Sequence, residues 1–394
     1  MSEVLTPVDE GETAALVGEA AKRGQRLTVR GGGTRSGLGR PDPSDAAVLS
    51  TEGLDGITLF EPSELVISAK AGTPLSTLES ALAEKRLMLP FEPMDHRTLY
   101  GTDGEPTVGA VAACNVSGPR RLSVGAARDH LIGVRLVNGR GEIVKSGGRV
   151  MKNVTGLDLV KLNAGAHGML GVLTEVTFKL LPVPEHRATV LFEGLSAAEA
   201  VVAMSKAMTL PLDVAAAAHL PAGTGDGPAR TLLRLEGFTE SVSYRIARLA
   251  EELSDLGTHA VIGGDEGDAL WRAIRDVRFL AGPEYEIVLR VHLPPSRTPE
   301  FLRELEPTGL HFFADWAGGL VWLGLPAGAD FSHWRNRARG FGGHTTMVRA
   351  PADLRSQEAV FEPLGEAVMR LTEGTKAAFD PQKIINFGRM YSGV

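Results

Sequence analysis

The sequence predicts an α+β protein of two domains, and three observations support this. The chain has 394 residues, well above the roughly 150 typical of one domain. Its 43% hydrophobic and 23% charged residues are those of an ordinary globular protein, and not of a disordered or fibrous one. After Pro182-Val183-Pro184, strand-like and helix-like stretches alternate in an α+β pattern, so we place the domain boundary at these prolines.

Composition also limits the function. The net charge of −7, from 41 basic and 48 acidic residues, gives no bulk electrostatic reason to bind nucleic acid or an acidic membrane. A single cysteine, Cys114, excludes an intramolecular disulfide, a thiolate zinc site and an iron–sulfur cluster held by this chain alone. We see no signal peptide before Glu19 and no apolar stretch near the ~18 residues that span a bilayer. We therefore expect a cytoplasmic protein. Any association with the inner membrane would be peripheral and would come through partner subunits.

The first half of the chain contains short predicted elements. Thr6 is the expected N-cap of a helix with Pro7 at its first position, which runs to Lys22 and is stopped by Gly24. A hairpin is expected because Gly139-Arg140-Gly141 joins two alternating stretches. The remaining predictions are strands at 27–30, 47–50, 65–69, 131–138, 142–145 and 171–181, and a helix over about 74–85 capped by Thr73.

In the second half, longer elements alternate. The predicted strands cover 188–192, 231–235, 260–262, 285–293 and 320–325, and the predicted helices cover 197–208, 241–256 and 265–280. A last helix over about 361–378 precedes a turn-rich tail that begins at Asp380-Pro381. This pattern divides the chain into residues 1–183, residues 184–360 and a C-terminal helix and tail, 361–394.

Glycine is the compositional outlier, with 47 of 394 residues, or about 12% against an average near ~7%. The loop Gly31–Gly39 does not suit a dinucleotide or P-loop motif, because Arg40-Pro41-Asp42-Pro43 follows it where those motifs need a helix. Such a loop can still hold a pyrophosphate in a nest of backbone N–H groups, with Thr34, Arg35 and Ser36 adding side-chain contacts. An ordinary glycine-rich turn is the alternative.

Two further segments favour the ligand interpretation. Gly165–Gly171 is followed by a strand, and Thr107–Arg121 has mostly small side chains before two arginines. Three segments that expose their backbone within the first domain would suit a long, flat ligand with two phosphates.

Motifs in the same order along essentially the whole chain resemble one superfamily. They are Gly72-Thr73-Pro74-Leu75, Gly118-Pro119-Arg120-Arg121, Arg128-Asp129, residues 150–159 (VMKNVTGLDL), Gly171-Val172-Leu173-Thr174-Glu175, Asp315-Trp316-Ala317-Gly318-Gly319, Gly342-Gly343-His344, Phe379-Asp380-Pro381 and Asn386-Phe387-Gly388-Arg389-Met390-Tyr391. With them the sequence resembles the vanillyl-alcohol-oxidase/PCMH superfamily of FAD enzymes, and within it the GlcE-type FAD-binding subunits of bacterial glycolate oxidase. The resemblance implies a PCMH-type FAD-binding domain (two α/β subdomains) at 1–183, an α+β cap or substrate domain with an antiparallel sheet at 184–360, and a C-terminal tail that returns to the FAD domain.

The resemblance also implies the cofactor contacts. The pyrophosphate loop corresponds to Gly31, Gly32, Gly33, Thr34, Arg35 and Ser36; the ribityl and diphosphate lining to Thr107, Gly109, Ser117 and Gly118; an adenine-side strand position to Val172; and the tail to Asn386 and Arg389. Relatives that hold FAD covalently place a histidine in the first loop, where Thr34 and Arg35 stand here, so the expected FAD is noncovalent. We interpret Cys114 as structural, with a flavin thioether as the alternative.

The implied reaction is oxidation of glycolate, a 2-hydroxy acid, to glyoxylate, with hydride passing to the flavin. Such a site needs a cation for the carboxylate and a base for the hydroxyl proton. Arg290 and His292 share one face of a predicted strand, and His344 is a third catalytic candidate. A solvated surface face is the alternative for the first two residues, and a capping or buried hydrogen-bonded role is the alternative for His344. His96, His167 and His186 show no ligand spacing, so we predict no metal site.

The resemblance further implies partners. Catalytic paralogues carry a histidine-bearing motif on a cap-domain strand, and Asp315–Gly319 here has no histidine. The implied partners are a catalytic flavoprotein subunit and an iron–sulfur subunit, which receives the electrons. Two alternatives remain: a non-catalytic structural or FAD-binding subunit that supports its partner, and a stand-alone D-lactate-type FAD dehydrogenase.

Overall fold

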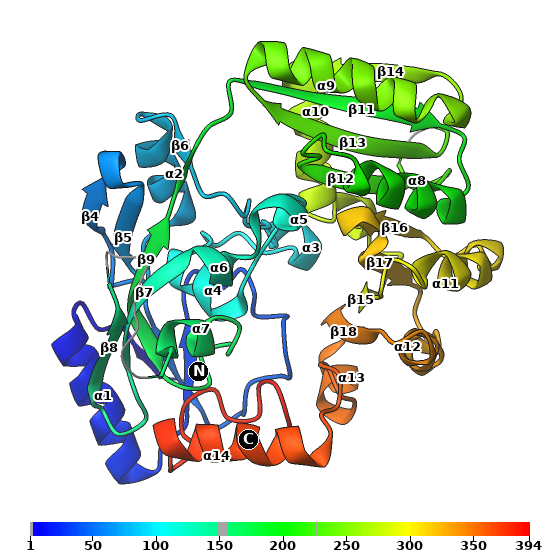
Figure 1. Cartoon of the computed structure of the whole chain (residues 1–394). Coiled ribbons are helices and arrows are strands. Elements are labelled where there is room, and N and C mark those ends of the chain that lie inside the picture. The colour runs from blue at the N-terminus through cyan, green and yellow to red at the C-terminus, as the bar shows by residue number, and fades with distance from the viewer. Residues whose placement is uncertain (1–2, 149–156, 226) are drawn as a thin grey trace.

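The computed structural model describes residues 3–148, 157–225 and 227–394, so residues 150–156 of the motif named above lie outside the described residues. Its first unit contains two sheets (Figure 1). The smaller is parallel and has the order β1 (Val4–Leu5), β3 (Ala47–Ser50), β2 (Leu27–Arg30), with α1 (Glu10–Arg23) beside it. The larger is antiparallel, with the order β4 (Ile57–Glu61), β5 (Val66–Lys70), β9 (Val172–Lys179), β7 (Leu131–Val137), β8 (Ile143–Gly147).

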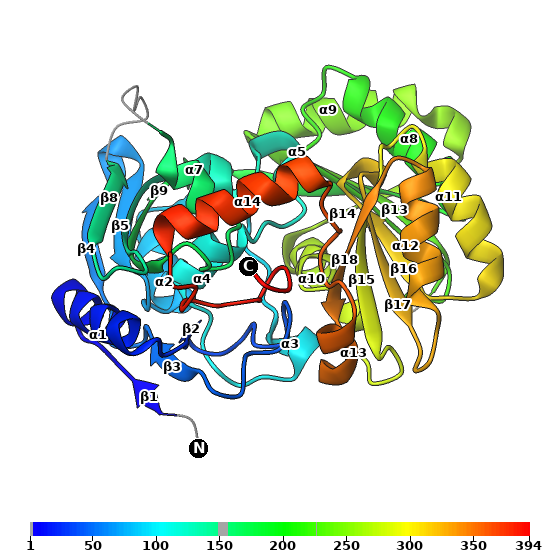
Figure 2. The same cartoon turned by 90° about the horizontal axis from the view of Figure 1, so that it is seen from below.

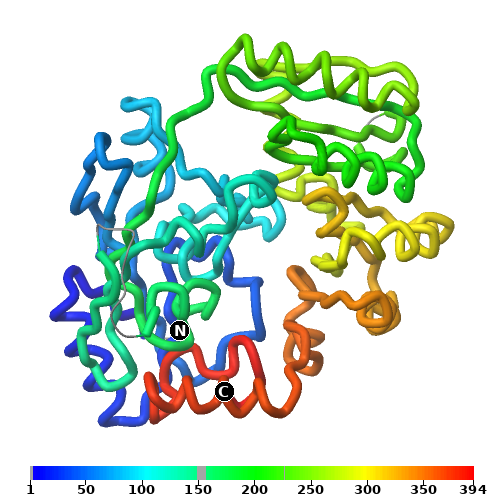
Figure 3. The backbone as a smooth tube through the Cα atoms, viewed as in Figure 1, coloured from blue at the N-terminus to red at the C-terminus, as the bar shows by residue number. Residues whose placement is uncertain are grey.

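Short helices connect these sheets, and the one at Val108–Cys114 forms part of the wall of the pocket described below. These helices are α2 (Leu75–Ala83), α3 (Arg97–Tyr100), α4 (Val108–Cys114), α5 (Arg121–Val124), α6 (Ala127–His130) and α7 (Leu159–Asn163). A two-stranded ribbon, β6 (Leu87–Met88) with β10 (Leu181–Pro182), ends the unit, and the chain then crosses to the second one (Figure 3).

The second unit is built on one antiparallel sheet of eight strands. Its order is β14 (His259–Gly263), β11 (His186–Glu193), β13 (Arg230–Gly237), β12 (Ala216–Leu220), β16 (Phe312–Asp315), β17 (Leu320–Leu325), β15 (Ile287–His292), β18 (His344–Arg349). The helices α8 (Ala197–Thr209), α9 (Thr239–Glu252), α11 (Thr298–Leu305) and α12 (Phe331–Gly340) cover its outer face (Figure 2). The predicted α+β fold class is confirmed.

The inner face of this sheet packs against the first unit. Val288, Phe313 and Trp322 point inward and share one hydrophobic core with α2, α4 and β9, whereas Leu289 and Val291 belong to the outer core. The helix α10 (Gly264–Arg275) adds Trp271 to the inner core. Alternation along β15 therefore directs every second side chain toward the first unit.

After β18 the chain passes through α13 (Ala352–Gln357) and α14 (Glu366–Phe379), and α14 leads the tail back beneath the first unit (Figures 1 and 3). There Ile384 and Ile385 join the core of the small sheet, and Ile385 bridges to Leu27 of β2. No helix among the described residues is both long and apolar enough to span a bilayer.

Several predicted element ends are wrong. The helix α1 starts at Glu10 and not after Thr6, because the Asp9 carboxylate accepts the Glu12 N–H and caps it there. The helix predicted over 74–85 starts after Pro74, which occupies the capping position in place of Thr73. The predicted last helix begins at Glu366 and not at 361.

Candidate functional site

A pocket of about 760 Å³ opens between the small sheet, α4 and the C-terminal tail. Most of the residues predicted to hold a cofactor line it. These are Gly31, Gly32, Gly33, Thr34, Arg35, Ser36, Thr107, Gly109, Asn386 and Arg389. Sequence positions from 31 to 389 thus meet in one cavity.

The loop after β2 presents free backbone donors. Among the described residues, the N–H groups of Gly32, Gly33, Thr34 and Arg35 donate to no protein acceptor, whereas the Ser36 N–H returns to the Gly33 carbonyl. Successive N–H groups without a protein acceptor can bind an anion as a nest. No helix follows the loop in the described structure, so a helix N-terminus does not contribute to this site. The predicted absence of a helix after the glycines is confirmed.

Neighbouring protein atoms leave no room for a side chain at the glycines of this loop. A Cβ on Gly32 would stand 2.0 Å from the Glu105 carbonyl oxygen, and one on Gly31 would stand 2.4 Å from Thr107 Oγ1. On the opposite wall, a Cβ on Gly109 would stand 2.6 Å from the Ala71 Cβ. Close packing of loop against loop keeps the backbone in place at the pocket.

Cationic side chains surround the same loop. Arg389 pairs with Asp42 at 3.0 Å and donates to the Arg35 carbonyl at 3.3 Å, and Arg30 lies 3.9 Å from Asp42. Arg35 is buried, donates to His96 Nδ1 at 3.3 Å, and leaves its Nη1 without an acceptor among the described residues. Asp42 is the one acidic residue among the lining residues, so the pocket carries an excess of positive charge.

The tail closes one side of the pocket through Asn386. Its side-chain oxygen accepts the Val29 N–H at 2.8 Å, and its Nδ2 donates to the His167 carbonyl at 2.9 Å. A backbone bond from the Asn386 N–H to the Leu27 carbonyl adds to this. The tail therefore ties β2 to the glycine loop that contains His167.

The segment 107–121 differs from its prediction as a backbone-exposing stretch, because most of it is helical. Thr107 precedes α4, and its buried Oγ1 has no partner in the described structure. Cys114 ends the helix at the pocket wall, and burial raises the pKa of its thiol. A run of small residues does not distinguish a loop from a tightly packed helix, so the sequence pattern did not reveal α4.

Three predicted cofactor residues lie outside the lining. Ser117 Oγ accepts the Ala127 N–H and donates to the Asn115 carbonyl. Gly118 accepts the Trp316 indole N–H at 3.1 Å, at the contact between the two units. Val172 is fully buried in the core of the small sheet, although its neighbours Gly171 and Leu173 line the pocket.

Sequence reasoning missed His167 as a pocket residue. Its Nδ1 is buried and has no partner in the described structure, and burial lowers its pKa to about 3. The position of His167 relative to the other histidines does not suggest a metal ligand. The glycine cluster Gly165–Gly171, which contains His167, is the sequence feature that indicates this wall of the pocket.

The three catalytic candidates lie together on the inner face of the large sheet. His292 on β15 pairs in register with His344 on β18, and their rings stack at 4.6 Å between centroids. Arg290, two residues before His292, lies over Trp316 at 5.0 Å from its guanidinium carbon to the ring centroid. Part of this face packs against the first unit, with Arg290 and His292 half-buried and His344 exposed.

Burial sets the charge of this cluster. It lowers the pKa of His292 to about 2, with Arg290 as the next cause, and it lowers the pKa of His344. The His292 imidazole is therefore neutral at neutral pH and a poor proton acceptor, whereas the pKa of His344 is displaced less. Burial, and then the charge of Arg121, lowers the pKa of Arg290 to about 10, so its guanidinium stays charged.

His96 connects the two groups of residues. It accepts from Arg35 of the pocket loop, and its ring stacks on Tyr100 at 5.8 Å. Burial lowers the pKa of His96 well below its usual value, and the charges of Arg35 and Arg290 both contribute to that shift. Neither His96 nor Arg290 lines the pocket itself, so His96 lies between the pocket loop and the residues on the inner face of the large sheet only through these contacts and charges.

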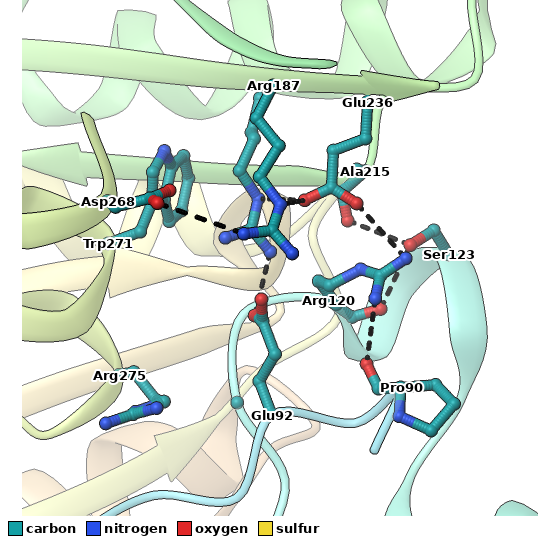
Figure 4. Close-up of polar contacts among 12 residues, drawn as sticks. Pro90, Glu92, Arg120, Ser123, Arg187, Ala215, Glu236, Asp268, Trp271 and Arg275 are labelled. Carbon is teal, nitrogen blue, oxygen red and sulfur yellow. Dashed lines mark hydrogen bonds and ion pairs between the residues drawn. The ribbon is translucent and has the colours of Figure 1, made fainter. Parts of the chain in front are cut away.

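An ion-pair network fixes the two units to each other (Figure 4). Glu236 of β13 lies 3.1 Å from Arg120 of the first unit and 3.1 Å from Arg234 of its own sheet. Arg234 in turn donates to Glu92 at 2.8 Å, and Arg187 lies 3.6 Å from Glu236. The side chains of Arg120, Arg234 and Glu236 are at most 9% exposed, so the pairs are weakly screened.

Comparison with known proteins agrees with this geometry. Residues 1–147 match the model of the FAD binding domain family. The chain is 34% identical over 371 residues to the glycolate oxidase subunit GlcE of Escherichia coli (strain K12), covering 93% of each chain. It is 28% identical over 239 residues to the glycolate oxidase subunit GlcD of Bacillus subtilis (strain 168), over 60% of this chain and 47% of that one.

Solved structures extend the likeness of the fold to almost the whole chain. A 4-ethylphenol oxidase from Gulosibacter chungangensis superposes with a TM-score of 0.72, over 99% of this chain and 89% of its own, at 15% identity. An alkyldihydroxyacetonephosphate synthase gives 0.66 over 97% of this chain and 75% of its own, also at 15% identity.

Proposed function

The chain belongs to the family of the glycolate oxidase subunit GlcE, and on that premise we propose that it is the FAD-binding subunit of a glycolate oxidase complex. In this complex glycolate is oxidised to glyoxylate, and the electrons pass to a partner subunit. The family is one of FAD-dependent 2-hydroxy-acid oxidoreductases.

The observation that carries the proposal is the loop of unpaired amides at the pocket. Free N–H groups at Gly32–Arg35, next to Arg35 and Arg389, suit the diphosphate of FAD. The buried and unpartnered Thr107 Oγ1 and His167 Nδ1 supply further polar groups to the walls. We assign Gly31–Ser36, Thr107, Gly109, Asn386 and Arg389 to this cofactor, within residues 1–183 and the tail 361–394.

When bound, FAD supplies the two-electron acceptor that takes the hydride from the C2 carbon of glycolate. The residues of this chain would bind and orient the substrate. Arg290 binds the carboxylate, and His344 accepts the hydroxyl proton. His344 is the better base of the stacked pair because the pKa of His292 is displaced further down. His292 then orients His344.

We infer that FAD is held without a covalent bond, since Thr34 and Arg35 occupy the loop positions where covalent relatives carry a histidine. An iron–sulfur subunit and a catalytic flavoprotein subunit complete the complex. A single cysteine leaves this chain unable to hold such a cluster by itself. Attachment at the inner membrane then comes through those partners.

The test is to purify the chain alone and with its partners, and to quantify flavin per chain. We expect one FAD per chain that is released by acid precipitation, and bleaching of the flavin by glycolate in the complex. A protein without flavin after incubation with FAD would favour a structural subunit. Turnover of D-lactate by the isolated chain would favour a stand-alone dehydrogenase.

A further inference from the structure

We propose that Arg121 and Arg290, one from each unit, form a two-arginine clamp on Trp316 that holds the carboxylate of a small 2-hydroxy acid. The proposal rests on the function proposed above and adds Arg121, a residue of the first unit, to the substrate site. The clamp is complete only where the two units meet.

The geometry brings the two guanidinium groups to one indole ring. The guanidinium carbon of Arg121 lies 4.5 Å from the Trp316 ring centroid, and that of Arg290 lies 5.0 Å from it. Arg121 begins α5, and Arg290 comes from β15, in the interior of the large sheet. Cation–π contact with the ring holds each guanidinium in place while leaving its N–H groups free.

The indole itself is fixed from both units. Its N–H donates to the Gly118 carbonyl of the first unit, and its backbone N–H donates to the Asp315 carboxylate at 2.7 Å. The Trp316 side chain is buried, and the His292 ring lies 5.4 Å away between centroids. Trp316 is therefore a rigid support that contacts both arginines and His292.

The charge of the two arginines is not neutralised within the described structure. Neither guanidinium makes a hydrogen bond or ion pair there, and Arg290 Nε is buried without an acceptor. Each lowers the pKa of nearby groups, and Arg121 contributes to the lowered pKa of Arg290. Burial of like charges without a counter-ion is unfavourable, so the arrangement favours a bound anion.

The nearby carboxylates do not supply that counter-ion. Asp315 is fully buried, and burial raises its pKa to about 7, which leaves it partly protonated at neutral pH. Asp129 contributes to the pKa of Arg121, but its carboxylate caps Ala126 and forms no ion pair with the Arg121 guanidinium in the described structure. Arg121 and Arg290 differ in this from the arginines of the ion-pair network, where buried Arg120 and Arg234 each contact a glutamate.

The neighbours of the clamp indicate a hydroxy acid. His344 stacks on His292, which follows Arg290 by two residues on the same strand face, so a hydroxyl next to the bound carboxylate would donate its proton to His344. The alternative is that Arg121 merely packs on the indole. That role needs the aliphatic length of the side chain and not its charge.

The experiment measures oxalate binding to the FAD-loaded protein by calorimetry, which needs no turnover. Arg121→Met keeps the length and removes the charge, and we expect it to raise the dissociation constant about tenfold or more. Arg121→Lys should recover part of the affinity. Arg370→Ala, at an exposed position of α14, is the matched control and should bind as the unchanged protein does.

In the complex, Arg121→Lys should raise the KM for glycolate more than it lowers kcat, because the carboxylate contact exists before and during reaction. Wild-type oxalate affinity in a folded Arg121→Met protein would overturn the clamp, and so would the absence of oxalate binding in the unchanged protein. Oxalate binding without flavin reduction by glycolate would instead contradict the proposed oxidation and leave the clamp standing.

Discussion

At the residue scale, Gly31 and Gly32 line a ligand pocket, but glycine is required at both positions because neighbouring protein atoms occupy the space of a side chain. The sequence analysis assigned this loop to a pyrophosphate through its backbone N–H groups. In the structure, a Cβ added to Gly32 would strike the Glu105 backbone. The sequence indicated the right loop, yet it could not show which neighbour the loop packs against, since that contact depends on the tertiary fold.

Replacing Gly32 with valine should therefore displace the whole loop and lower both FAD occupancy and the thermal midpoint. Flavin absorbance per chain and calorimetry measure the two effects. Gly374→Ala is the matched control, because open space surrounds that glycine in α14, and it should stabilise the helix by up to about 1 kcal/mol. Full flavin occupancy in a folded Gly32→Val protein would contradict the assignment of this loop.

Asp315 predicts a pH effect on stability. Burial raises its pKa from 3.8 to about 7, so the folded protein retains a proton that the unfolded chain releases between about pH 4 and 7. The free energy of unfolding contributed by Asp315 is thus largest below pH 4 and falls as the pH rises toward 7. Asp315→Asn should reduce the fall in thermal midpoint between pH 5 and pH 8. Parallel profiles for the two proteins would show that this carboxyl ionises normally.

At the element scale, most of the longer helices and strands were predictable, whereas several very short or uniformly buried elements were not. The helices α8, α9 and α10 and the strands β11, β13, β15 and β17 all overlap their predictions. Among the missed strands, β12 has the sequence AAAHL and is buried throughout, so neither propensity nor alternation marks it. Its position between β13 and β16 forces the extended conformation.

The helix α14 presents one fully buried side chain, Lys376, which anchors the tail. Its Nζ donates to Asp380, to the Met169 carbonyl and to the Ile385 carbonyl, each at 2.7 Å. Asp380 in turn accepts the N–H groups of Ile384 and Ile385. The pair thereby positions Asn386 at the pocket without contacting it.

Lys376→Met should destabilise the protein by about 3–5 kcal/mol, because it leaves the buried Asp380 carboxylate without its cation. FAD occupancy should fall as well, since the tail then loosens around Asn386. Urea unfolding and flavin content measure both, and Lys376→Met combined with Asp380→Asn should recover part of the stability. Unchanged unfolding in the single variant would mean that the pair contributes little.

At the scale of the whole molecule, the two units share a core and an electrostatic contact. The inner face of the large sheet completes the hydrophobic core of the first unit, and Glu236 connects arginines from both. The sequence predicted the boundary between Pro182 and Pro184 but could not predict this interface. Contacts such as Arg121 with Trp316 join positions about two hundred residues apart, and no local pattern encodes them.

Glu236→Gln should leave three arginines close together with one carboxylate fewer, and destabilise the protein by about 3–5 kcal/mol. Glu251→Gln removes an exposed carboxylate that pairs with Arg248, and it should change stability by less than about 1 kcal/mol. Thermal midpoints compare the two. Equal midpoints would show that the network adds nothing to the joining of the units.

The strand β2 is bordered by Ile385, and the Val29 N–H of β2 donates to the side chain of Asn386, which lies 357 residues later in the sequence. A ribosome adds about 5–20 residues each second, so the nascent chain waits tens of seconds between making these two halves. Until then the glycine loop has no wall on that side. A cofactor that needs this wall would therefore bind only after the C-terminal tail has been synthesised.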